Sequence, residues 1–159
     1  MTQFFTQNSD VILKLTLAVV LGMVIGIERI LVHKEAGMKT HALVSMGAAL
    51  FIIISETMAL TYISVPGFNP IMMASQIVVG IGFLGAGSIM FQNSHVSGLT
   101  TAGGLWVTAG IGMAAGFGLY SLAIISTILV LFVFIAMYSL EAPLRALSEK
   151  KSNPDKSEL

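Results

Sequence analysis

The chain has 159 residues, of which 55 % are hydrophobic and only 10 % are charged, and its formal net charge is zero. Soluble domains carry about 25 % charged residues, so this composition, with a mean hydropathy of +0.90, excludes an ordinary soluble domain and indicates an integral membrane protein. The sequence contains no cysteine, which excludes disulfide bonds, thiolate metal sites and thiol nucleophiles within it.

Five apolar segments are long enough to cross a bilayer as helices, because the hydrocarbon core needs roughly 20 apolar residues per crossing and lipid offers the backbone no hydrogen-bond partner. A turn rich in proline and glycine follows the second segment, and a polar loop at residues 92–98 follows the third. Between the fourth and fifth segments, Gly116 and Gly118 mark the expected turn. The predicted spans are Val11–Ile27, Ala42–Ser64, Ile71–Phe91, Leu99–Leu119 and Tyr120–Leu140.

The distribution of Lys and Arg predicts the orientation in the membrane. Seven of the eight lie within residues 29–39 and 145–156, and such residues are retained on the cytoplasmic side during insertion. Five crossings, with the N-terminus outside and the C-terminus in the cytoplasm, place both clusters on that side, whereas four crossings separate them. We therefore expect an all-α transmembrane domain at residues 1–140 and a short polar cytoplasmic tail at residues 141–159. Residues 1–10 contain no Lys or Arg, so the first apolar run is expected to be a retained anchor and not a signal peptide.

Glycines in the first, third and fourth spans are expected to let helices approach closely, since van der Waals packing drives helix association in lipid. The stretch Gly80–Gly85 (GIGFLG) matches a dinucleotide-binding fingerprint, but that fingerprint requires a preceding strand, so we prefer helix packing. The fifth span has no glycine and is expected to be the helix most exposed to lipid. The predicted packing positions are Gly22, Gly26, Gly80, Gly85, Gly98 and Gly104.

Three polar residues are predicted in the outer half of the membrane. Glu56 is a carboxylate inside a span, which costs about 2.5–3.5 kcal/mol on insertion scales, so it should face the bundle or a wet cavity. Lys14 and Gln76 lie at similar depth in the predicted topology. We expect one polar cluster with a Lys14–Glu56 ion pair. The alternative is that Lys14 extends outward and Glu56 is protonated or bonded to threonine or backbone groups, and a transport or proton-relay role for Glu56 also stays open.

A second polar group is predicted at the cytoplasmic boundary, where the first span ends and the fourth begins. Hydroxyl groups at the start of the fourth span can cap that helix. The group is either a solvated membrane anchor or a functional cytoplasmic surface. Histidines there could bind a metal or sense pH, but no carboxylate stands at a clear ligand spacing, so we prefer ordinary interfacial histidines and assign no metal site. The polar candidates are Glu28, Arg29, Thr40, Thr100 and Thr101, and the histidines are His33, His41 and His95.

Four sequence blocks resemble the MgtC/SapB family of membrane proteins. They are Gly26–Arg29 (GIER), Gly37–Phe51 (GMKTHALVSMGAALF), Gly80–Gly87 (GIGFLGAG) and Val96–Ala109 (VSGLTTAGGLWVTA). The resemblance implies a multi-pass protein of the bacterial inner membrane with about five spans, linked to magnesium homeostasis, growth in low magnesium and virulence. It also implies binding to other membrane complexes, including the proton-conducting part of ATP synthase. The matching motif positions are Glu28, Arg29, Gly37, Thr40, Gly85, Gly98, Thr100, Thr101 and Trp106.

The resemblance has one departure. Many family members continue into a soluble cytoplasmic domain after the last span, whereas the polar tail of this chain is too short to bury a core. We therefore expect the membrane part to act by itself or with partners.

Two functional hypotheses follow from these features. The leading one is a non-enzymatic protein that modulates ion homeostasis through helix contacts with other membrane proteins, such as ATP synthase or an ion transporter. The rival is a small transporter or channel for a cation or small solute, suggested by Glu56, Gln76 and the glycine-interrupted spans; a pore of this kind would need homo-oligomers. No serine–histidine–acid order, zinc-binding helix or phosphate loop is present, so we expect no catalytic residue, no cofactor and no nucleic-acid partner.

Overall fold

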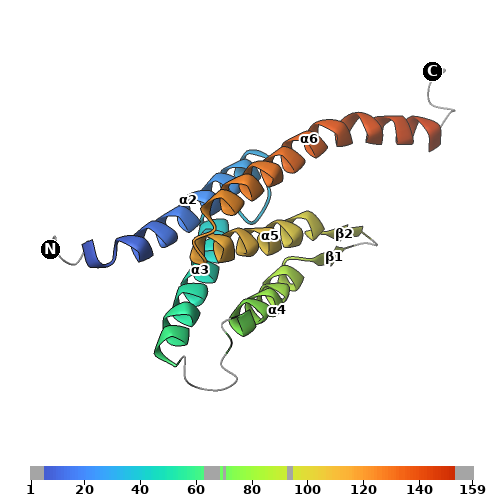
Figure 1. Cartoon of the computed structure of the whole chain (residues 1–159). Helices are drawn as coiled ribbons and strands as arrows, with labels where there is room; N and C mark the ends of the chain where they lie inside the picture. Colours follow the sequence, from blue (N-terminus) through green and yellow to red (C-terminus); the bar gives the residue numbers. More distant parts are fainter. Residues whose placement is uncertain (1–5, 63–68, 70, 93–94, 153–159) are drawn as a thin grey trace.

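The computed structural model describes residues 6–62, 69, 71–92 and 95–152, with the backbone alone at 92 and 139–152. Within these residues the chain forms five helices and one small β-hairpin (Figure 1). In chain order the elements are α2 (Ser9–Leu31), α3 (Met38–Thr61), α4 (Ile71–Gly87), β1 (Met90–Gln92), β2 (His95–Ser97), α5 (Leu99–Gly116) and α6 (Tyr120–Ser152).

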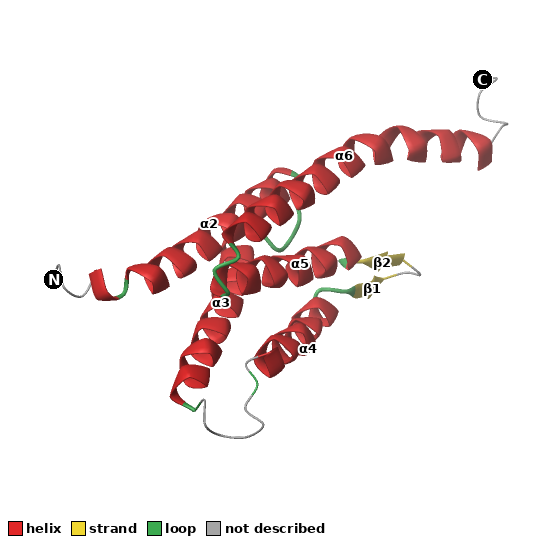
Figure 2. Ribbon diagram, viewed as in Figure 1, coloured by secondary structure: helices red, strands yellow, loops and turns green. Residues whose placement is uncertain are grey.

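The helices correspond in order to the five predicted spans, which confirms a mainly helical fold. Three of the described helices are long and apolar enough to cross a membrane: α2, α3 and the segment Tyr120–Tyr138 of α6. Helix α4 is a shorter apolar helix of 17 residues. Helix α6 continues without interruption past residue 140 to Ser152 (Figure 2), so the predicted border between span and tail falls inside a helix.

The third span was predicted too long. Its helix ends at Gly87, and the apolar residues Met90 and Phe91 belong to a strand that pairs with β2 in antiparallel register. The two partners Phe91 and Val96 face each other across the hairpin. The residues expected to form a polar loop therefore contribute a strand, which connects α4 to α5.

Helix α5 is the centre of the bundle and packs against each of the other four described helices. In addition α2 packs along α3 and alongside α6, while α4 contacts α5 and, less extensively, α3. The buried face of α5 consists mainly of small residues such as Ala109, Gly112 and Ala115, which keep the helix axes close enough for van der Waals contact.

Four of the predicted packing glycines lie at helix contacts. A Cβ atom on Gly22 would lie 2.5 Å from the His41 carbonyl oxygen, and one on Gly26 would collide with the Met38 backbone. These two glycines therefore allow α2 to approach α3. A Cβ on Gly104 would lie 3.1 Å from the ring of a phenylalanine on α6, and one on Gly85 would make an ordinary contact of 3.6 Å with an alanine of α5.

Two other predicted packing positions do not lie at a contact between helices of this chain. Gly80 has open space, because a Cβ there would meet no atom within 4 Å. Gly98 has a φ of 87° and precedes α5, and a Cβ there would collide with the Ser88 carbonyl; glycine is needed for this left-handed turn. The tightest contacts of α5 come instead from Gly112 and Gly116, whose Cβ atoms would collide with the backbone of α3.

Among the three long apolar helices α6 is the least buried, as expected for the span without glycine. Only 11 % of its apolar window is buried, against 28 % in α2 and 33 % in α3. Helix α4 is also largely exposed, since only Ile81 and Gly85 are buried. The glycine content of α4 therefore does not reflect burial within this chain.

Candidate functional site

A buried polar cluster joins four helices at the end of α2. Glu28 and Arg29 come from the last turn of α2, and the Nε of Arg29 donates a hydrogen bond to the Glu28 Oε2. The Arg29 side chain is only 3 % exposed. Its guanidinium carbon lies 3.5 Å from the centre of the Phe134 ring on α6, within the range of a cation–π interaction. The arginine charge is thus held between a carboxylate and an aromatic face.

His41 continues this cluster from the first turn of α3 and is completely buried. Its Nδ1 lies 2.8 Å from the Thr108 hydroxyl oxygen of α5, which is also 2.8 Å from the Gly104 carbonyl oxygen. A hydroxyl has one proton and a carbonyl can only accept, so Thr108 donates to Gly104 and accepts from the His41 Nδ1–H. The opposite charges of Glu28 and Arg29 both lie close enough to the imidazole ring to interact with it electrostatically.

Two buried polar atoms near this cluster, Glu28 Oε1 and Ser45 Oγ, have no hydrogen-bond partner among the residues that the structure describes. Each such atom costs about 1–3 kcal/mol when it stays unsatisfied. Buried polar atoms without partners call for an explanation such as a bound molecule or a functional role. The described residues contain no group of three or more His, Asp or Glu side chains that could hold a metal ion.

The sequence analysis offered a solvated anchor for Glu28 and Arg29, and the burial of these side chains contradicts it. Glu28 and Arg29 are buried inside the bundle and do not form a solvated anchor, and His41 is an interior residue. Helix α5 begins after Gly98 without a side-chain cap, so the expected threonine cap is not formed.

The remaining candidates on this side divide by exposure. Thr101 is buried, whereas Thr40, Thr100, His33 and His95 are exposed. His41 and Ser45 are both buried on α3, and their four-residue spacing, which puts both on one helix face, is the sequence signal that could have shown this.

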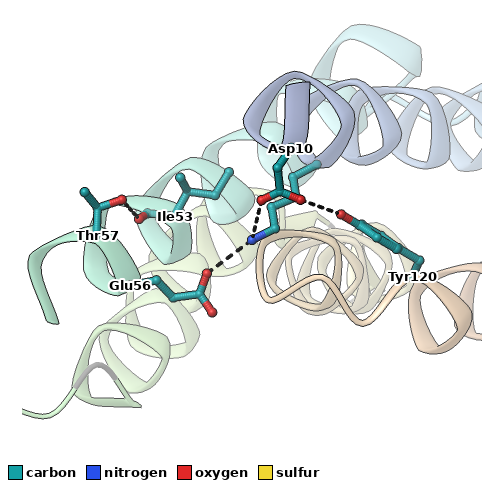
Figure 3. Close-up of polar contacts among 6 residues, drawn as sticks. Asp10, Ile53, Glu56, Thr57 and Tyr120 are labelled. Carbon is teal, nitrogen blue, oxygen red and sulfur yellow. Dashed lines mark hydrogen bonds and ion pairs between the residues drawn. The ribbon is translucent and has the colours of Figure 1, made fainter. Parts of the chain in front are cut away.

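A second polar cluster lies at the opposite end of α2 (Figure 3). Lys14 Nζ lies 3.3 Å from Glu56 Oε2 and 3.2 Å from Asp10 Oδ2. The Tyr120 hydroxyl donates to Asp10 Oδ1 at 3.2 Å, so α2, α3 and α6 all contribute. The Lys14–Glu56 pair confirms the prediction. The sequence analysis missed Asp10 and Tyr120, although the spacing of Asp10 and Lys14 is that of a helical ion pair.

Gln76 does not join this outer cluster. Within the described part of the chain no hydrogen bond links it to Lys14 or Glu56, and it lies instead in a groove between α3 and α4. The groove has a volume of about 490 Å³ and is otherwise apolar. Gly47 of α3 and Gly80 of α4 both line it, and a Cβ on either would meet nothing within 4 Å.

Comparison with known proteins identifies the family. The profile of the MgtC family matches residues 15–142, which include the buried polar cluster and the groove but begin after Asp10 and Lys14 of the outer cluster. The chain belongs to the MgtC family. This membership and the three apolar helices make it a membrane protein.

Three relatives illustrate the similarity. "Putative magnesium transporter YhiD" of Escherichia coli (strain K12) is 41 % identical over 136 residues, covering 80 % of this chain and 62 % of that protein. "Protein MgtC" of Salmonella typhimurium (strain LT2) is 47 % identical over 120 residues, covering 76 % and 49 %. "Uncharacterized protein slr0014" of Synechocystis is 40 % identical over 129 residues, covering 81 % and 53 %. The chain thus spans about half to three fifths of these relatives, and no solved structure matches it.

The fold brings together the sequence blocks that carry the family resemblance. The blocks at 26–29, 37–51 and 96–109 supply the helical residues of the buried cluster, apart from the α6 phenylalanine. The block at 80–87 supplies part of the groove wall. In this MgtC-family chain the blocks therefore meet at two places, a buried polar cluster and an apolar groove.

Proposed function

We propose that this chain is a non-enzymatic, multi-pass protein of the bacterial inner membrane that acts in magnesium-linked ion homeostasis by binding other membrane proteins. In this proposal the groove between α3 and α4 receives a transmembrane helix of the partner. The printed name of the Escherichia coli relative supports the link with magnesium. The resemblance to the family supports partners such as an ATP synthase or an ion transporter.

The observation that carries the proposal is the open space beside Gly47 and Gly80. Glycine within a helix costs about 1 kcal/mol relative to alanine, and Gly22 or Gly112 repays that cost by close packing inside the bundle. Gly47 and Gly80 make no such internal contact, yet they lie across from each other in one apolar groove. Helix association in lipid favours small residues at the interface. A second helix in this groove would make close contacts with both glycines and so explain why they stand there.

We also propose five crossings with the N-terminus outside and the C-terminus in the cytoplasm. This arrangement puts the exposed Lys34 and Lys39 on the cytoplasmic side, in agreement with the positive-inside rule. At 1.5 Å per residue α4 spans about 26 Å, slightly less than the hydrocarbon core of about 30 Å. Reporter fusions after residue 35 and at the C-terminus should both give cytoplasmic signals, and a signal from opposite sides would refute the topology.

The groove can be tested with introduced thiols, because the natural chain has no cysteine. Gly80→Cys should form thiol-specific cross-links to the partner in native membranes. Gly82→Cys is the matched control, since it lies on the same helix and is exposed but does not line the groove. Equal cross-linking from both positions, or none from Gly80→Cys, would contradict docking in the groove.

A blocking variant provides the functional readout. Gly80→Leu should extend into the groove, since its Cβ would meet no atom within 4 Å. It should remove the cross-linked or co-purified partner and fail to restore growth of a deletion strain in low magnesium. Gly82→Leu should behave like the natural chain in both assays. A Gly80→Leu chain that keeps its partner and supports growth would exclude this function for the groove.

Transport by an oligomer of the chain is the second candidate. It is favoured by the name of the Escherichia coli relative and by the cluster of Lys14, Asp10 and Glu56, which places charges at the ends of two apolar helices. Purified chain in liposomes should then conduct magnesium or another cation, and Glu56→Gln should abolish the flux without loss of folding. Flux that is absent from liposomes of the natural chain would exclude this candidate.

A further inference from the structure

Gln76 of α4 is the one polar side chain among the described residues that line the groove between α3 and α4. The other lining residues are apolar or glycine. Helix α4 lies at the edge of the bundle, beside α5 (Figure 1). Its lining residues recur every three or four positions, which puts them on one face of the helix. They are Met73, Gln76, Ile77, Gly80, Ile81 and Leu84.

The side-chain amide of Gln76 forms no hydrogen bond with the residues that the structure describes, although such an amide can donate two and accept two. The side chain is exposed, so the amide is accessible to a molecule that enters the groove. In the proposed topology Gln76 lies about 8 Å along the axis from the outer end of α4 at Ile71. Hydrocarbon tails offer no hydrogen bond at that depth. The occupant of the groove therefore has to provide the partner of this amide.

Gly80 marks where the occupant can approach most closely. A Cβ atom there would meet no atom within 4 Å, and close helix contacts in lipid are made by small residues on both sides. Gln76 lies about 6 Å closer to the outer end of α4, on the same helix face. Four residues advance any α-helix by this distance. The residue of a docked helix that reaches Gln76 is therefore four positions from its own small residue.

We propose that Gln76 selects the helix that docks in the groove, through a hydrogen bond to a carboxamide or hydroxyl side chain that lies four residues from a small residue. This inference rests on the proposed docking of a partner helix and adds which sequences fit. In a partner helix parallel to α4 the polar residue precedes the small one, and in an antiparallel helix it follows. A purely apolar helix fills the same space but leaves the Gln76 amide without a partner, so it binds less tightly.

The test uses two synthetic transmembrane peptides as probes and the full chain in phosphatidylcholine vesicles. Both peptides are leucine-rich helices with a central glycine. The first carries asparagine four residues before and four residues after the glycine, to serve either orientation, and the second carries leucine there. Energy transfer from Trp106, the single tryptophan of the chain, to a dansyl group on the peptide measures binding. We expect the asparagine peptide to bind about fivefold more tightly, in line with the strength of hydrogen bonds between membrane helices.

Gln76→Leu should bind the two peptides with equal affinity, because it removes the amide from an exposed position. Ser75→Leu is the matched control and should keep the fivefold preference. Ser75 is the exposed polar neighbour on α4, but its hydroxyl donates to the Met72 carbonyl of the same helix and it does not line the groove. Association of the peptides with each other is the same for every variant, so it cannot produce a difference between them.

Gly80→Leu tests whether the peptides bind in the groove, and it should weaken the binding of both. Equal affinity of the natural chain for the two peptides, or an unchanged preference in Gln76→Leu, would overturn selection by Gln76 and leave docking intact. Binding that Gly80→Leu does not weaken, or no binding of either peptide, would overturn the selection as well. Docking of the natural partner is measured separately by the Gly80→Cys cross-links in native membranes, so a failure of the proposed function is distinguishable from a failure of this inference.

Discussion

Alanine substitutions at Gly110 and Gly112 of α5 should have very different effects on stability. A Cβ at Gly110 would meet no atom within 4 Å, whereas a Cβ at Gly112 would collide with the carbonyl group and Cα of Ser45. Backbone atoms cannot rotate away, so Gly112→Ala must push α3 and α5 apart. The same substitution in the same helix, two residues away, provides the control.

The magnitude follows from two contributions. Replacing glycine by alanine within a helix gains about 1 kcal/mol, and this gain is common to both variants. Overpacking at a tight contact typically costs 1–3 kcal/mol and occasionally more; a collision with backbone belongs at the upper end. The free energy of unfolding of Gly112→Ala should therefore be about 3 kcal/mol below that of Gly110→Ala.

The assay is unfolding of the purified chain in mixed micelles by increasing mole fraction of sodium dodecyl sulfate, followed by loss of helical circular dichroism. The natural chain should fall between the two variants. If Gly112→Ala were as stable as Gly110→Ala, the close contact between α3 and α5 would be refuted, and with it the central position of α5.

Three further predictions concern the polar clusters and use the same unfolding measurement. Thr108→Val leaves a buried imidazole N–H without its acceptor and should cost about 1–3 kcal/mol, whereas Thr100→Val, at an exposed position, should change the free energy by no more than about 0.5 kcal/mol; equal effects would contradict the buried hydrogen bond. Phe134→Leu removes the aromatic face over the buried arginine and should cost about 2 kcal/mol, and the exposed Phe132→Leu should have almost no effect. Lys14→Met should cost less than about 1 kcal/mol, because the partner carboxylates of Asp10 and Glu56 are 67 % and 37 % exposed. A larger loss would contradict a weak contribution of these ion pairs to stability.

Hydropathy predicted the helices and their order because each apolar segment carries its own signal. The Lys14–Glu56 pair was also predictable, since the depth of each residue within its span follows from simple counting along the helix. The hairpin was not, because Met90 and Phe91 continue an apolar run and a strand of three residues is too short to show a period of two.

The buried cluster depends on contacts that no local pattern contains. Adjacent opposite charges at the end of a span are typical of a headgroup anchor, and the sequence of Glu28 and Arg29 fits that pattern. Their burial depends on contacts with distant residues, such as the contact of Arg29 with Phe134 of α6. The sequence also does not tell which glycines contact another helix. Gly110 and Gly112 have similar sequence surroundings, and only the position of α3 decides which of them packs.

The contact between Arg29 and Phe134 has a consequence for biosynthesis. The ribosome adds about 5–20 residues per second, so residue 134 follows residue 29 by about 5–20 seconds. During that interval the arginine has entered the bilayer region without the ring that later shields it. We therefore expect the insertion machinery to hold the newborn chain until α6 arrives, and chains truncated before residue 134 should be recognised and degraded by membrane proteases.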